Sequence, residues 1–111
     1  MNNEFLIVKN MKLFINSLDG IIIPNRDRNL KYKMYNTCYE VLFLLYRANL
    51  EKNKKDYIKD IISNISMIDF YLERCLKNKY ISSKVCERKA RELINITKMI
   101  YGWAKYESGC K

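Results

Sequence analysis

The residues of this sequence best suited to chemistry are positively charged, and they recur at helical spacing near the C-terminus. Five of them follow one another at intervals of four, three, seven and seven residues: Lys84, Arg88, Arg91, Lys98 and Lys105. Because one helical turn takes about 3.6 residues, these intervals place all five on one face of a helix. Such a basic face is suited to the phosphates of RNA or DNA, because each neutralised phosphate releases counterions.

An alternative interpretation is a solvated face whose charge is offset by acids. Glu87 precedes Arg91 by four residues and Glu92 follows Arg88 by four, so two ion pairs can form along the helix. Each such pair contributes only about 0.2–0.5 kcal/mol. The pairs leave three lysines without a partner in the helix, namely Lys84, Lys98 and Lys105. We take phosphate contact as the leading interpretation of this face.

Further cations cluster where the sequence indicates that helices start or end. Six of them open or close a helical segment: Arg26, Arg28, Lys31, Lys33, Lys77 and Lys79. The last two also complement the dipole at a helix C-terminus, which is a purely structural reason for them. We predict that these six residues add to a nucleic-acid interface. Stacking on bases is a further expectation for three tyrosines near helix ends: Tyr32, Tyr80 and Tyr106.

No set of residues supports catalysis, a cofactor or a metal. The chain has no histidine, which excludes a Ser-His-Asp triad, a Cys-His pair and any histidine metal site. Its acids are scattered, and no two cysteines have the C-x-x-C spacing of zinc or redox motifs. Three cysteines fall on or beside apolar stripes, where Cys acts as a small hydrophobe: Cys38, Cys75 and Cys86. We therefore expect a protein that is not an enzyme.

The composition indicates one helical domain with anionic partners. The 111 residues include 21 Lys and Arg against 12 Asp and Glu, a net charge of +9 that favours nucleic acid first and anionic membrane second. Three glycines and one proline are too few for a turn-rich β fold, and 49% hydrophobic residues are too many for disorder. No uncharged run approaches the roughly 20 residues of a membrane span, and the N-terminus lacks the pattern of a secretion signal. We expect a cytoplasmic location without membrane contact.

Three short breaks divide the chain into four segments of helical period. The breaks fall at 20–25, 51–55 and 77–83, and the helices are expected at about 3–18, 27–50, 55–78 and 83–106. In the last segment the main apolar stripe comprises Cys86, Ala90, Leu93, Thr97, Ile100 and Ala104. Helices of similar length joined by tight turns predict an all-α, up-down-up-down four-helix bundle that forms a single domain over residues 1–111.

The last segment also carries apolar residues beside its main stripe, namely Ile96, Met99 and Trp103. These either widen the core face or form a subunit interface, where Trp, Tyr and Met are enriched. Gly102 lies inside the predicted helix, where glycine costs about 1 kcal/mol relative to alanine. This glycine suggests the close approach of another backbone, or a looser helix. We expect Ile96, Met99, Gly102 and Trp103 to serve in packing or in an oligomer.

Three sequence stretches, in this order and spacing, resemble the Avd-like four-helix bundle family. They are IIIPNRDR at 21–28, IDFYLERCLKNKYIS at 68–82 and KMIYGWAKYE at 98–107. The last stretch is similar to the glycine–tryptophan signature of the family and is the most specific of the three. The family includes the accessory variability determinant of diversity-generating retroelements and the 23S rRNA intervening-sequence proteins.

The resemblance implies a homopentameric barrel of four-helix protomers with a basic surface. In retroelements it implies a non-catalytic subunit that binds RNA or DNA and a reverse transcriptase, for cDNA synthesis and mutagenic retrohoming. It also implies that Gly102 and Trp103 are a helix-end packing signature. One departure concerns late helix three, where Asp69 and Glu73 replace the arginines of many family members. The alternative function is an intervening-sequence-type oligomer that is structural and binds only protein.

Overall fold

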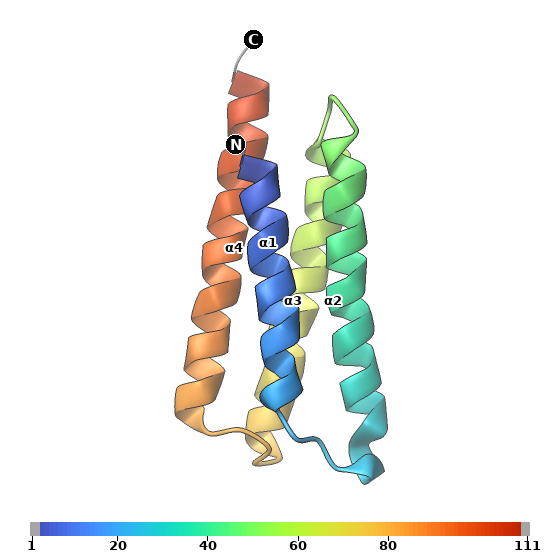
Figure 1. The fold of residues 1–111 in the computed structure, drawn as a ribbon, viewed down its shortest axis with the longest axis vertical. Coiled ribbons are helices and arrows are strands. Elements are labelled where there is room, and N and C mark those ends of the chain that lie inside the picture. The colour runs from blue at the N-terminus through green and yellow to red at the C-terminus, as the bar shows by residue number, and fades with distance from the viewer. Residues whose placement is uncertain (1–2, 110–111) are drawn as a thin grey trace.

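Four long helices make up the chain, and their bounds agree closely with the expected segments. They are α1 (Asn3–Ser17), α2 (Arg28–Asn49), α3 (Lys55–Lys77) and α4 (Ser83–Gly109). In this computed structural model, which describes the backbone of residues 3–109 and the side chains of residues 6–105, they alternate in direction as a four-helix bundle (Figure 1). Two short 3₁₀ helices, Leu18–Gly20 and Asn25–Asp27, form the connection between α1 and α2.

The ends of the helices follow local backbone chemistry. Ser82 is the N-cap of α4, since its Oγ accepts a hydrogen bond from the Val85 backbone N–H at 3.2 Å. The end of α3 closes in the opposite sense. The Tyr80 N–H donates to the Cys75 carbonyl at 2.8 Å and the Lys79 N–H donates to the Leu76 carbonyl. This is a Schellman pattern, which requires a left-handed backbone at the residue after the C-cap. Lys79, with φ of 64°, takes that position instead of the usual glycine.

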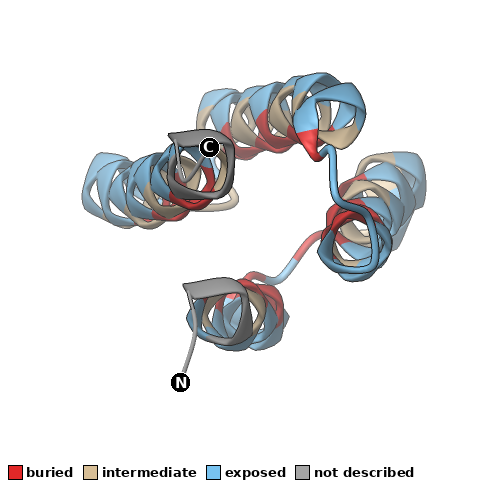
Figure 2. Ribbon diagram, turned by 90° about the horizontal axis from the view of Figure 1, so that it is seen from above, coloured by how far each residue is buried: buried red, intermediate tan, exposed pale blue. Residues whose placement is uncertain are grey.

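The core runs the length of the bundle between the helices (Figure 2). In the first three helices, apolar residues at helical spacing are buried, among them Met11, Phe14, Val41, Ile68 and Leu72. The α4 stripe is rotated from the expected one. Ile96 and Trp103 are buried, whereas Cys86, Ala90, Thr97 and Ala104 are only half-buried.

The rotation of α4 has a simple packing cause. This helix contacts both α1 and α3, so the face directed into the bundle lies between those two neighbours. Cys86 of the expected stripe lies toward α3, with Sγ 3.9 Å from the Leu72 carbonyl, whereas Ile96 lines a groove shared with α1. Helices α2 and α4 make no contact within the described part of the chain and lie diagonally across the bundle (Figure 2).

Candidate nucleic-acid interface

All eleven cations that the sequence proposed for nucleic-acid contact have exposed side chains. They comprise the α4 stripe of Lys84, Arg88, Arg91, Lys98 and Lys105, together with Arg26, Arg28, Lys31, Lys33, Lys77 and Lys79. None of the eleven forms an ion pair with another described side chain, because the one salt bridge found there joins Lys89 to Glu92. The two pairs that could offset the stripe, Glu87–Arg91 and Arg88–Glu92, do not form. The full charge of the stripe therefore faces solvent.

The fold brings part of the helix-end clusters together with the start of the stripe. The α1–α2 and α3–α4 connections lie at the same end of the bundle (Figure 1). There, one carboxylate oxygen of Asp27 accepts hydrogen bonds from Tyr80 Oη at 2.9 Å and Asn78 Nδ2 at 3.2 Å. Arg26 shares an open hollow with Tyr80, and Arg88 shares an adjacent hollow with the same tyrosine. Tyr80 therefore lines both hollows, one shared with Arg26 just before α2 and the other shared with Arg88 of α4.

Other predicted cations lie apart from this region. Lys31 and Lys33 lie on α2, which does not contact α4, so they do not extend the stripe. Lys105 lies at the far end of α4, about 25 Å along the helix from Arg88 at about 1.5 Å per residue. The interface supported by the geometry is thus a band that begins at the connection end of the bundle and continues along α4.

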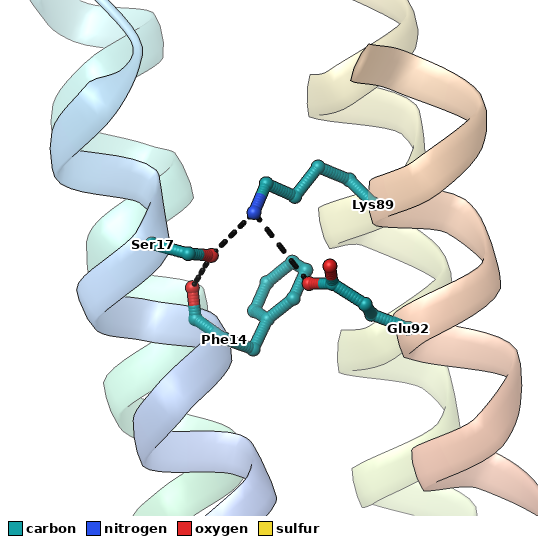
Figure 3. Close-up of polar contacts among 4 residues, drawn as sticks. All are labelled: Phe14, Ser17, Lys89 and Glu92. Atoms are coloured by element: carbon teal, nitrogen blue, oxygen red, sulfur yellow. Dashed lines mark hydrogen bonds and ion pairs between the residues drawn. The ribbon is translucent and has the colours of Figure 1, made fainter. Parts of the chain in front are cut away.

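The lysine beside Arg88 on α4 points inward and has a different environment. Lys89 is 5% exposed, and its Nζ donates to Ser17 Oγ at 2.5 Å while that hydroxyl donates to the Phe14 carbonyl at 2.6 Å (Figure 3). Its Nζ also lies 3.5 Å from a carboxylate oxygen of Glu92 and 5.9 Å from the Phe14 ring centroid. This network ties α4 to α1. The sequence held a signal for it, because Lys89 precedes Leu93 by four residues and Ile96 by seven.

A second lysine is buried at the opposite end of the bundle. Lys54, in the α2–α3 turn, lies with Nζ 5.0 Å from the ring centroid of Trp103 and donates to the Glu51 carbonyl at 2.7 Å. This turn therefore packs against the Trp103 side of α4. The indole Nε1–H of Trp103 is buried and has no acceptor among the described residues. No spacing pattern in the sequence distinguishes Lys54 from its exposed neighbours Lys52 and Lys55, so its burial is seen only in the structure.

The residues expected to serve in packing or an oligomer divide between core and surface. Ile96 and Trp103 lie in the protomer's own core, and Met99 is half-buried between α1 and α4. Gly102 is exposed, and a Cβ built on it meets nothing within 4 Å, so no described backbone approaches it. Of the three tyrosines near helix ends, Tyr32 is exposed and Tyr80 half-buried, whereas the side chain of Tyr106 lies outside the described residues.

The three cysteines of the described chain, Cys38, Cys75 and Cys86, are free thiols that form no disulfide there. Burial raises the pKa of Cys38 from 9.0 to about 12 and that of Cys75 to about 11. Burial, followed by the nearby carboxylates of Asp69 and Glu73, also raises the pKa of Cys86. These shifts suppress thiolate formation and agree with a packing role. Cys110 lies outside the described residues, and the described side chains contain no cluster with the composition of a metal site.

No helix in the described range is both long and apolar enough to cross a membrane. Comparison of the chain with protein-family models, curated proteins and solved structures finds no match.

Proposed function

We propose that the protein is a non-catalytic, oligomeric accessory protein that binds RNA or DNA and partners a reverse transcriptase. The observation that carries the proposal is the band of exposed cations along α4 and the adjoining end of the bundle, none of which forms an ion pair with another described side chain. Phosphate contacts position a protein on nucleic acid without reading its sequence, so we expect low base specificity. We propose a reverse transcriptase as the partner because of the resemblance to the Avd-like family.

Assembly needs a surface of another kind, and α2 carries one. Its outward face has an exposed row of large apolar side chains: Tyr32, Tyr39, Phe43, Tyr46 and Leu50. Between Lys33 and Arg47 the only charged residue of α2 is Glu40. Copies that each carry a charge of +9 repel one another, and contact across a face with few charges lowers that cost. We propose that this face joins the copies into the homopentamer that the resemblance to the Avd-like family implies.

The experiment measures RNA binding and assembly on the same samples. Fluorescence anisotropy with a labelled RNA is compared for the intact protein and for Arg88→Glu/Arg91→Glu/Lys98→Glu, with light scattering as the measure of assembly. The matched control carries the same three charge reversals at exposed lysines around the opposite end of the bundle: Lys52→Glu/Lys55→Glu/Lys59→Glu. We expect the α4 variant to lose most of its RNA affinity while its assembly is retained, and the control to lose much less.

The alternative function is a structural oligomer that binds only protein, and the apolar row on α2 is the observation that favours it. In that case RNA affinity is weak throughout and the two triple variants behave alike. Equal loss of affinity in the two variants would show that bulk charge, rather than the α4 band, attracts the RNA. Co-purification of the partner reverse transcriptase with the intact protein and with the α4 variant separates partner binding from nucleic-acid binding.

A further inference from the structure

A groove runs between α1 and α4 immediately beside the basic stripe. Its volume is about 480 Å³, and its lining includes Leu13 and Met99 as apolar groups and Asn10, Asn95 and Glu92 as polar ones. This volume lies in the range of small-molecule pockets, of roughly 300–1,000 Å³. Ser17 and Glu92, which also line the groove, both contact the Nζ of Lys89 (Figure 3). The groove is therefore a site of mixed polarity.

The polar side chains that line the groove have hydrogen-bonding capacity that the described residues leave unfilled. Among the described residues, the Asn10 side-chain amide donates only to the thioether sulfur of Met99, at 3.6 Å, and sulfur is a weak acceptor. Asn95 is exposed and has no hydrogen-bond partner among the described residues. Glu92 has a single charged neighbour there, Lys89 Nζ at 3.5 Å, which leaves most of its acceptor capacity free. Together they offer two amides and a carboxylate to a ligand.

The stripe and the groove share neighbouring positions on α4. Residues three or four apart lie side by side on a helix surface. Asn95 is therefore flanked by Arg91 on one side and Lys98 on the other, and Glu92 adjoins Arg88. A phosphate backbone that follows these cations passes along the open edge of the groove. The groups attached to that backbone then lie within reach of the amides and of Leu13.

We propose that the α1–α4 groove receives unpaired bases of single-stranded RNA whose phosphates lie on the α4 stripe. This inference rests on the proposed function and names its substrate class. Bases in a duplex are stacked and paired, so only a single strand can turn its bases toward a protein groove. The amides match base edges, Leu13 and Met99 offer apolar contact, and the Glu92 carboxylate accepts from a 2′-hydroxyl or an exocyclic amino group. A carboxylate with acceptor capacity favours RNA over DNA because deoxyribose lacks that hydroxyl.

The test compares three probes in fluorescence anisotropy at one salt concentration. They are a labelled unstructured single-stranded RNA, its RNA duplex and the DNA strand of the same sequence. The groove variant is Asn10→Leu/Asn95→Leu, and the matched control makes the same two changes at asparagines of α2 and α3 that line neither the groove nor the apolar row, Asn49→Leu/Asn64→Leu. We expect the intact protein to prefer the single-stranded RNA. We expect the groove variant to lose about tenfold in that affinity, about the contribution of one or two hydrogen bonds, with duplex binding unchanged.

A second readout locates the bases. Photocrosslinking with 4-thiouridine in the single-stranded RNA, followed by mass spectrometry, is expected to label residues 10–17 and 92–99. Equal affinity for single strand and duplex, a preference for DNA, or crosslinks confined to α2 overturns the inference. The α4 triple reversal separates a failure of the groove inference from a failure of the proposed function. If it weakens both RNAs while the groove variant behaves as its control, the groove inference alone fails; if it weakens neither, the proposed function fails as well.

Discussion

Two adjacent lysine and arginine side chains of α4 offer a matched test of the interface. Arg88 is exposed and Lys89 is 5% exposed, so removing either charge changes the net charge equally at neighbouring positions. We compare Arg88→Met with Lys89→Met, since methionine keeps an unbranched stem in both cases. The interface model expects the first change to alter RNA binding and the second to alter stability. A bulk-charge model expects both to alter RNA binding alike.

The size of the binding effect follows from counterion release. Each phosphate contact adds about 0.7 to the slope of log affinity against log salt for a single strand. Losing the Arg88 contact therefore lowers the slope by about 0.7, and the affinity lost between 50 and 200 mM salt falls by a factor of about 2.6. Lys89→Met leaves the slope unchanged, because its ammonium group is directed at Ser17 and Glu92.

The stability effect is expected in the other variant. Lys89→Met removes a buried charge, whose desolvation costs several kcal/mol, together with one hydrogen bond to a charged group, of about 1.5–3 kcal/mol. The groups left behind stay satisfied, because Ser17 still donates to the Phe14 carbonyl and the Glu92 side chain is 39% exposed to water. We expect the free energy of unfolding to rise by about 1 kcal/mol, or Tm by about 5 °C. Arg88→Met is expected to stay within about 0.5 kcal/mol.

The assays are anisotropy titrations of labelled single-stranded RNA at four salt concentrations and thermal unfolding followed by circular dichroism. A slope that falls equally in both variants refutes the placement of phosphate contacts on the exposed stripe. A loss of more than about 1 kcal/mol in Lys89→Met refutes the reasoning on burial, because the hydrogen bond to Ser17 then outweighs the desolvation of the ammonium group.

Three further predictions concern stability. Lys79→Gly removes the strain of a left-handed backbone at the end of α3 and is expected to raise the free energy of unfolding by about 1 kcal/mol, measured by urea titration. An unchanged free energy of unfolding would show that Lys79 is not strained. Trp103→Phe removes a buried indole N–H without an acceptor among the described residues and is expected to cost less than about 1.5 kcal/mol, against about 3–5 for Trp103→Ala. The raised pKa values of Cys38 and Cys75 contribute stability that is intact below pH 9 and declines as pH rises through about 11 to 12. Cys38→Ala/Cys75→Ala is therefore expected to lose stability less steeply over that interval in pH-dependent denaturation.

The sequence predicts the helices well because their determinants are local. The spacing of apolar residues and the Ser82 cap act within a few residues, so they locate the helix ends without knowledge of the neighbours. The face that α4 buries depends instead on which helices lie beside it. The burial of Lys54 and Lys89 depends on partners across the bundle, Trp103 in one case and Ser17 in the other. The same holds for the α1–α4 groove, since its two walls are about eighty residues apart in the chain.

The two proposed surfaces lie on diagonal helices, one basic and the other mostly apolar, and the net charge of each copy couples them. Contact between copies through the α2 face leaves each α4 stripe outside that contact, because α2 and α4 do not touch within the described chain. Repulsion between copies of charge +9 opposes assembly, and both salt and bound RNA reduce that repulsion. Added salt should therefore favour assembly while it weakens RNA binding, whereas RNA at low salt should favour assembly. By linkage, assembly then raises RNA affinity by the same factor by which RNA promotes assembly.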